Sequence, residues 1–397
     1  MRVLISGGGI AGLTLAYWLN RYDIDVVVIE RAERIHHDGY GLDFYGTGYD
    51  VAERMGLLER LAQQQIPFEH VAYVDASGKM LAHIDIALMQ KIMRNRYMAL
   101  MHWTLEQALY EAIADAVEIR YGTTFTGIQA DADEVAVTFN DGTTDTFDLL
   151  IGADGVHSKV RQLIFGEEAL FQHYMGYYFA SYQLPDQYGV GHAWKNYVEP
   201  GRLTGAYCSN REGEIVTFLM YRAVDKGNIP REQRLPELKQ VYAGMGWITQ
   251  RLLDDVPNPD AIFMDTMTQI QMPSWYRGRV ALVGDACGCP TSLSGQGASM
   301  GMGGAYVLAH ALHSASRYDD ALLHYQEQVK PFVERHQKNA RGIAKTFLPN
   351  TTLELVVQRL LLKLLFRESF TGLLRQQFGV ESLLEAPNDG GMHVPSS

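Results

Sequence analysis

Three glycines close to the start of the chain have the spacing of a phosphate-binding turn. Gly7, Gly9 and Gly12 form the pattern G-x-G-x-x-G, and Glu30 follows 18 residues after Gly12. Glycines so placed permit a tight turn, let a phosphate approach the backbone, and allow a helix to pack closely on a strand. A carboxylate at Glu30 can accept hydrogen bonds from ribose hydroxyls. The pattern predicts a bound dinucleotide; the alternative is a tight turn that binds nothing.

Two further glycine–aspartate motifs follow, each after an apolar run. The sequence "GADG" contains Asp154, and "VGDACGCP" contains Gly284 and Asp285. Ser158 and Arg161 follow the first of these motifs in an S-x-x-R pattern, for which a structural ion pair and a cofactor contact are both reasonable roles. The chain thus carries three such motifs in order, and their joint occurrence is more specific than any one of them.

Regular elements must bring these motifs together. Residues 2–6 and 25–30 are short apolar runs typical of buried strands, and residues 11–21 have helical spacing. Strand, turn, helix and strand form a βαβ unit, whose strands are parallel with a right-handed crossover. Further along, the patterns predict a hairpin turn at residues 140–142 and helices over residues 48–64, 104–116, 231–253 and 318–386.

The three motifs resemble those of the class A flavoprotein monooxygenases, relatives of p-hydroxybenzoate hydroxylase, over about residues 1–345. The resemblance implies an α/β fold with a Rossmann-like FAD-binding domain of the glutathione reductase type, a second, β-sheet-based substrate domain, and C-terminal helices. We expect an FAD-binding domain of residues 1–70, 98–170 and 265–345, a substrate domain of 71–97 and 171–264, a helical segment of 346–386 and a disordered tail of 387–397. Residues 351–379 are interpreted as a packed helix, with a lid or a membrane-surface helix as alternatives.

The resemblance implies FAD as the cofactor. Its ADP half would lie on the first βαβ unit, its ribityl chain beside Asp285, and its ring against Pro290 and the loop before a helix that begins near Gly297. Asp43 could face the ribityl chain or the substrate, or simply cap a loop. The expected cofactor-binding residues are Gly7, Gly9, Ile10, Ala11, Gly12, Glu30, Arg31, Asp43, His102, Asp154, Gly284, Asp285, Pro290, Gly295, Gln296, Gly297 and Ala298.

The family's chemistry belongs to the flavin. NADPH or NADH binds transiently and reduces it, and O2 then forms a C4a-hydroperoxyflavin that oxygenates an aromatic or polycyclic small molecule. The protein excludes water and orients the substrate, so no particular catalytic side chain is expected. Candidate walls of the substrate pocket, although such residues belong more often to a core, are Tyr177, Phe179, Tyr207, Phe218 and Pro290.

Some positions depart from the family's usual residues. Gly288 stands where histidine is frequent, Gly303 and Gly304 where an acidic pair is frequent, and His102 where arginine is frequent. The surrounding segments are similar to a divergent branch that includes antibiotic-modifying and natural-product-tailoring oxygenases. Two other functions stay open: a flavin-dependent reductase or dehydrogenase of the same fold, and a non-catalytic flavin-binding protein.

Composition narrows the class of protein. The net charge of −12 argues against the basic surface that nucleic acids require, and 47% hydrophobic with 20% charged residues is typical of a soluble globular protein. With only three cysteines, Cys208, Cys287 and Cys289, neither a disulfide framework nor a metal site is expected. No apolar run is long enough to span a membrane. We expect a cytoplasmic monomer or homodimer.

Overall fold

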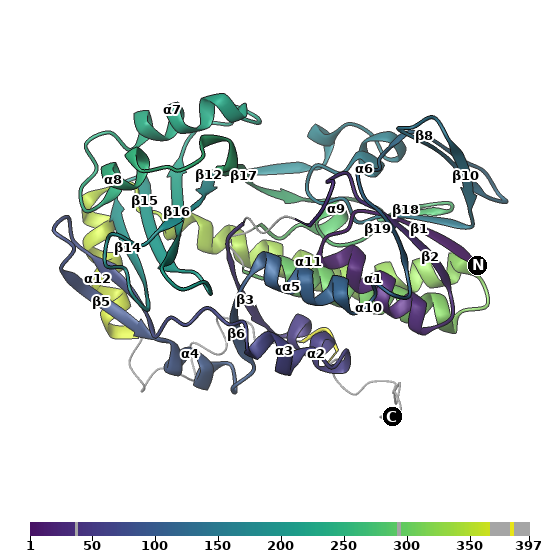
Figure 1. Cartoon of the computed structure of the whole chain (residues 1–397), viewed down its shortest axis with the longest axis horizontal. Helices are drawn as coiled ribbons and strands as arrows, with labels where there is room; N and C mark the ends of the chain where they lie inside the picture. The colour runs from purple at the N-terminus through teal and green to yellow at the C-terminus, as the bar shows by residue number, and fades with distance from the viewer. Residues whose placement is uncertain (36–38, 292–294, 366–381, 385–397) are drawn as a thin grey trace.

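The computed structural model describes residues 1–35, 39–291, 295–365 and 382–384. In this part of the chain a six-stranded sheet carries the glycine motifs, with the strand order β18-β19-β11-β1-β2-β7 (Figure 1). Strand β1 pairs in parallel with both β2 and β11, which confirms the predicted βαβ unit. The six strands are β1 (Arg2–Ser6), β2 (Asp25–Ile29), β7 (Glu118–Arg120), β11 (Leu149–Gly152), β18 (Tyr276–Arg277) and β19 (Val280–Leu282).

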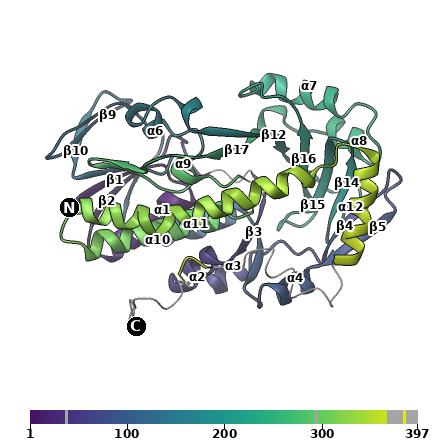
Figure 2. The same ribbon diagram turned by 180° about the vertical axis from the view of Figure 1, so that it is seen from behind.

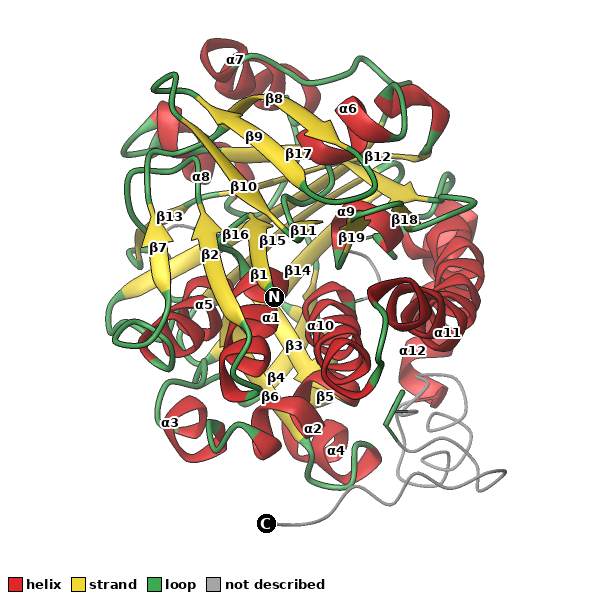
Figure 3. Cartoon of the chain, turned by 90° about the vertical axis from the view of Figure 1, so that its right-hand side faces the viewer, coloured by secondary structure: helices red, strands yellow, loops and turns green. Residues whose placement is uncertain are grey.

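Helices cover one face of this sheet, and a small antiparallel sheet with α6 lies over the other (Figure 3). Helix α1 packs against both α10 and α5, and α10 packs in turn against α11. In the small sheet β9 and β10 form the predicted hairpin around residues 140–142. These elements are α1 (Ile10–Arg21), α5 (His102–Glu111), α6 (Lys159–Ile164), α10 (Gly297–Ser314), α11 (Tyr318–Phe347), β8 (Phe125–Ala130), β9 (Val135–Phe139) and β10 (Thr144–Phe147).

A second large sheet has the order β17-β12-β16-β15-β14-β4-β5, with β13 paired to β16. Its pairs are antiparallel except β14–β4. Its outer face carries α7 (Arg231–Val241) and α8 (Thr249–Asp254). The strands are β4 (His70–Val74), β5 (Met80–Asp85), β12 (Gln172–Ser181), β13 (Gln183–Pro185), β14 (Ala193–Glu199), β15 (Arg202–Cys208), β16 (Glu214–Arg222) and β17 (Phe263–Ile270).

A two-stranded sheet of β3 (Gly41–Tyr45) and β6 (Tyr97–Met101) lies between the two large sheets. Around it are α2 (Thr47–Arg54), α3 (Leu58–Ala62) and α4 (Ile86–Ile92), while the short α9 (Asp285–Gly288) follows β19. The long helix α11 runs along the back of the molecule from the first large sheet toward the second (Figure 2). The predicted fold class, with its FAD-binding fold, further sheet layer and C-terminal helices, is confirmed.

Several predicted helices are shorter than the sequence pattern suggested. Residues 48–64 form two helices, α2 and α3, because Gly56 between them adopts a positive φ of 73°. Residues 231–253 likewise divide into α7 and α8 around Gly244 and Trp247, which also have positive φ. The predicted helix 104–116 ends at Glu111.

The structure describes only part of the segment that was predicted to be helical at the C-terminal end of the sequence. Residues 318–386 give α11 and α12 (Thr352–Leu365), and α12 lies against β5 and β14. Residues 366–381 of that prediction and the whole predicted tail, 387–397, lie outside the described residues. Within the part of the chain that is described, no helix has the length and apolar character needed to cross a membrane.

Candidate functional site

The glycine turn after β1 leaves an open backbone surface at one position. A Cβ on Gly7, whose φ is +115°, would overlap the carbonyl oxygen of Ala153. A Cβ on Gly12 would overlap the carbonyl oxygen of Gly7. A Cβ on Gly9 would meet only the Glu106 carboxylate, 3.5 Å away. Two of the glycines are therefore required by packing, and the third leaves the open approach that a pyrophosphate needs.

A cavity of about 440 Å³ lies over this turn, at the carboxyl ends of the central strands. This is the edge of a parallel sheet where nucleotides bind, and the first turn of α1 offers unpaired N–H groups there. We call it the nucleotide cavity. The predicted residues that line it are Gly7, Gly9, Ile10, Ala11, Glu30, Arg31, His102, Asp154, Gly284, Asp285, Gly297 and Ala298.

Glu30 is held in place by backbone groups at the end of β2. One carboxylate oxygen accepts a hydrogen bond from the Gly8 N–H and the other from the Ala32 N–H, each at 2.8 Å. A carboxylate has about four lone-pair sites, so both oxygens keep capacity for a further donor. The carboxylate is thus oriented before a ribose arrives.

The first aspartate motif caps a helix as well as lining the nucleotide cavity. Asp154 accepts hydrogen bonds from the backbone N–H groups of Lys159 and Val160, at 2.8 and 3.1 Å, at the start of α6. Arg161 is fully buried and donates to the carbonyl oxygens of Ala286, at 2.9 Å, and Val156. Arg161 therefore ties the loops after the two aspartate motifs together, which favours the structural role over cofactor contact.

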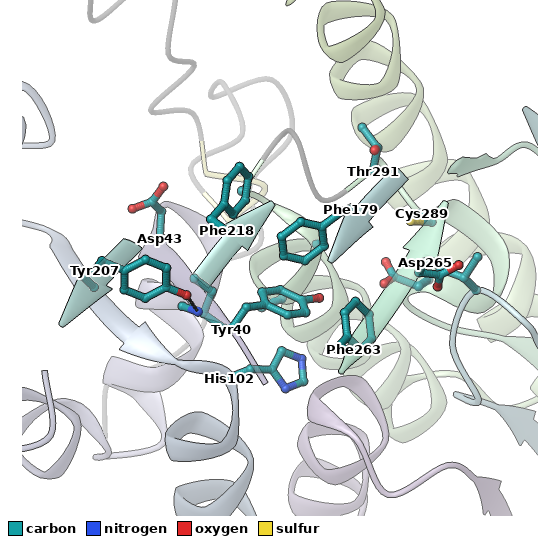
Figure 4. A pocket seen from close by; sticks show the side chains of 18 of the residues that line it. Tyr40, Asp43, His102, Phe179, Tyr207, Phe218, Phe263, Asp265, Cys289 and Thr291 are labelled. Carbon is teal, nitrogen blue, oxygen red and sulfur yellow. Dashed lines mark hydrogen bonds between the residues drawn. The ribbon is translucent and has the colours of Figure 1, made fainter. Parts of the chain in front are cut away.

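A second cavity, of about 270 Å³, adjoins the first. Four residues line both: His102, Asp285, Gly297 and Ala298. Aromatic side chains from the second large sheet form much of its wall, and Figure 4 shows Phe179, Tyr207 and Phe218 among them. We call this the aromatic cavity. Asp43 and Gly295 also line it, so the structure brings Asp43 to the aromatic cavity and not to the nucleotide cavity.

Four predicted residues are not among the described residues that line either cavity: Gly12, Tyr177, Pro290 and Gln296. Tyr177 lies on the same face of β12 as Phe179 but further along it, in a core with Leu203 and Met220. Strand alternation gives the face of a side chain, but not its position along that face. The Pro290 carbonyl accepts a hydrogen bond from Gln269 Nε2 at 3.2 Å, and Gln296 is the N-cap residue of α10.

Charged groups meet at the wall that the two cavities share. Burial alone would lower the pKa of the His102 imidazole, but the Glu106 carboxylate, 3.5 Å from Nδ1, holds that pKa above its usual value with a smaller contribution from Asp285. Burial raises the pKa of Asp285, and the Cys289 thiol and His102 partly oppose this. His102 can thus offer a cation at the position where the family often has arginine.

The sequence reasoning missed several residues of the aromatic cavity, including Tyr40, Trp194, Phe263 and Asp265. Tyr40 and Trp194 belong to no motif, so only the fold reveals them. Asp265 gave the clearest signal, because it is the one charged residue of β17. It approaches His157 Nε2 at 3.3 Å, and His157 lines the nucleotide cavity.

Two of the three glycines that depart from the family pattern, Gly288 and Gly303, have a packing explanation. A Cβ on Gly288 would come within 2.9 Å of Val333 and 3.1 Å of Trp275. A Cβ on Gly303 would overlap the Thr47 side chain of α2. Larger residues are excluded at these two positions because neighbouring elements approach closely, whereas a Cβ on Gly304 would meet nothing closer than 3.7 Å.

Comparison with known proteins agrees with a flavoprotein fold. A family model described as "FAD binding domain" matches residues 1–340. A flavin-dependent monooxygenase of Legionella longbeachae is 31% identical over 351 residues, which cover 88% of this chain and 90% of that protein. The crystal structure of tetracycline destructase Tet(51) has a TM-score of 0.81 at 28% identity, covering 92% of this chain and 98% of the other.

A second solved structure, Klebsiella pneumoniae HpxO complexed with FAD and uric acid, has a TM-score of 0.80 at 23% identity over 96% of this chain and 98% of its own. At 23% identity, this likeness shows a shared fold alone. The fold and the two joined cavities define a dinucleotide-dependent flavoprotein. The chain belongs to the FAD-binding-domain family, and its predicted resemblance to FAD-dependent monooxygenases is confirmed.

Proposed function

We propose that this protein uses NADPH or NADH, together with O2 and a bound FAD, to place one oxygen atom on an aromatic or polycyclic small molecule. The main support is the continuity of the two cavities through His102, Asp285, Gly297 and Ala298. An FAD whose ADP half occupies the nucleotide cavity would reach the aromatic cavity with its ring. The substrate would then lie between that ring and the aromatic wall.

The residues present fit an FAD. Gly9 would face the pyrophosphate, with the N–H groups of α1 directed at its charge. Glu30 would accept hydrogen bonds from the ribose of the ADP half, and Asp285 from the ribityl hydroxyls. The ring would lie beside Gly295 and the N-terminus of α10, whose dipole favours negative charge on the reduced ring. FAD, once bound, supplies the redox and oxygen-transfer chemistry.

The chain itself orients the substrate and keeps water away from the ring. Phe179 and Phe218 lie with ring centroids 4.9 Å apart, and Trp194 lies 5.6 Å from Phe218. Such a wall holds a planar ring by apolar contact and edge-to-face packing. Excluding water limits wasteful release of peroxide and strengthens polar interactions in the cavity.

The test is an anaerobic titration of the purified, FAD-loaded protein with NADPH and then NADH, followed by readmission of ¹⁸O2 in the presence of a candidate substrate. A tetracycline is a reasonable first candidate, because a structural neighbour at 28% identity is a tetracycline destructase. The proposal predicts bleaching of the flavin absorption and one ¹⁸O atom in the product. A flavin reductase would bleach and return only peroxide across a broad aromatic panel. A non-catalytic flavin-binding protein would stay oxidised with every substrate added.

A further inference from the structure

The nucleotide cavity holds a carboxylate at the position proposed for the pyrophosphate of FAD. The Glu106 side chain lines this cavity, and its Oε1 lies 3.5 Å from where a Cβ on Gly9 would be. Gly9 is the residue whose open backbone would face the pyrophosphate. A diphosphate carries negative charge, so a carboxylate beside it opposes binding unless a cation compensates it.

His102 is the group that can compensate Glu106. Both residues belong to α5, one helical turn apart, and Nδ1 of His102 lies 3.5 Å from Oε2 of Glu106. The two side chains are 34% and 21% exposed, so a bound dinucleotide would shield the pair further from water. Among the described residues that line both cavities, His102 alone can carry a positive charge.

The charge of this pair depends on pH because histidine titrates near neutrality. Burial would lower the pKa of the His102 imidazole, but Glu106 on the same helix and Asp285 of α9 hold it above its usual value. The Tyr40 ring, which precedes β3, lies 5.8 Å from the imidazole, and burial raises the pKa of its hydroxyl, so Tyr40 stays neutral. The pair therefore changes from neutral to negative when His102 loses its proton.

The nearby cations of the cavity do not take the place of His102. Among the described residues the Glu106 carboxylate has one ion-pair partner, which is His102. Lys159 donates to the Phe125 carbonyl oxygen, and His157 pairs with Glu168 and Asp265. The other charged residues that line the nucleotide cavity are Glu30, Arg31, Asp154, His157, Lys159 and Asp285.

We propose that the His102–Glu106 pair makes FAD binding pH-dependent: protonated His102 neutralises Glu106 and admits the pyrophosphate, whereas neutral His102 leaves a carboxylate that repels it. FAD binding alone is required for this effect, and oxygen transfer is not. Because the protonated form binds FAD more tightly, bound FAD must raise the pKa of His102. The affinity for FAD should therefore be constant below the pKa of His102 in the FAD-free protein and fall as pH rises above it.

The first test measures how tightly the full-length protein holds FAD. Diluted FAD-loaded protein is equilibrated at about pH 6 and about pH 8.5, and free FAD is measured by its visible absorption after ultrafiltration. The reference is His102→Arg, whose charge does not titrate in this range. We expect the dissociation constant of the parent, divided by that of His102→Arg, to rise at least about fivefold from the lower to the higher pH. Titrating groups common to both proteins cancel in this ratio, so an unchanged ratio would overturn the proposal.

Replacing Glu106 tests the repulsion itself. Glu106→Gln removes the charge and keeps the shape of the side chain, so it should bind FAD about fivefold more tightly than the parent at the higher pH and within about twofold of it at the lower pH. Glu59→Gln, the same change at an exposed position of α3, should leave both dissociation constants unchanged. Equal or weaker binding of FAD by Glu106→Gln at the higher pH would overturn the proposal.

A double variant separates this role from a purely structural one. His102→Gln leaves Glu106 uncompensated at both pH values, so it should bind FAD weakly at each. Adding Glu106→Gln to it should recover affinity, because the two side chains act as one unit. If both residues only supported the fold, the double variant would bind FAD more weakly than His102→Gln alone, and that result would contradict the proposal.

Discussion

The nucleotide cavity and the aromatic cavity are built in different ways. The first is centred on the glycine turn of a βαβ unit, and Asp154, Gly284 and Asp285 of the two later motifs also line it. The second is made of side chains from strands far apart in the chain, such as Asp43 on β3, Phe179 on β12 and Asp265 on β17. A site formed by backbone geometry is therefore constrained by a motif, whereas a site formed by side chains is free to vary with the substrate.

The largest effect should come from Gly12. Gly12→Val would force a side chain into the Gly7 carbonyl, so we expect a loss of about 3 kcal/mol or more of folding stability and no bound FAD. Denaturant unfolding and the visible spectrum measure the two effects. Gly9→Ala is the matched control: its Cβ has 3.5 Å of clearance, so it should fold but bind FAD more weakly. A stable, yellow Gly12→Val protein would contradict the packing role.

Gln337 on α11 supports the loop beside the proposed ring position. It is buried, and its Nε2 donates to the carbonyl oxygens of Ile270 at 2.7 Å and Cys289 at 2.9 Å. Gln337→Leu leaves both carbonyls without this donor and should cost about 2 kcal/mol, measured by denaturant unfolding. Gln328→Leu, at an exposed position of the same helix, should cost little. Equal losses in the two variants would show that the hydrogen bonds are unimportant.

Phe218 lies on the face of the second large sheet that borders the aromatic cavity, so its substitution can be compared with one on the opposite face. Phe218→Ala should lower kcat/KM about tenfold through loss of substrate packing, with the dissociation constant of FAD unchanged. Leu219, the next residue, lies in the core on the opposite face of β16. Leu219→Ala should therefore lower stability and leave KM unchanged, as steady-state kinetics of the folded fraction can show. The reverse pattern would assign the substrate to the other face.

The smallest effect concerns His157, which lines the nucleotide cavity and contacts Asp265, a lining residue of the aromatic cavity. Its raised folded-state pKa of about 9 means that its stabilising contribution is complete below about pH 6.5 and disappears as pH rises through 9. The side chain is 47% exposed, so solvent screening limits the contribution to about 1 kcal/mol. His157→Gln should lower the free energy of unfolding near pH 6 and match the parent protein near pH 10.

Unfolding curves at those two pH values measure this difference. His173→Gln, at an exposed position on β12, is the control and should behave like the parent at both. A deficit of His157→Gln that persists undiminished at high pH would show that the charge is not its cause.

The same contrast explains what the sequence could reveal. The βαβ unit and the glycine roles could be predicted because they depend on residues close together in the chain, and Asp154, Gly284 and Asp285 could be assigned to the same cavity because they lie in short motifs. Tyr177 and Phe179 share a strand face, yet only Phe179 lines the aromatic cavity, and Tyr40 and Trp194 carry no local signal. Helix breaks at Gly56 and Trp247 depend on positive φ values that periodicity does not report.

The most direct test of the account is a crystal structure of the protein with FAD. The account predicts the pyrophosphate over Gly9, the ribityl chain beside Asp285, and the ring inside the aromatic cavity next to Gly295. A structure in which the ring lies outside that cavity, or in which another group covers Gly9, would contradict the claim that the two cavities form one site.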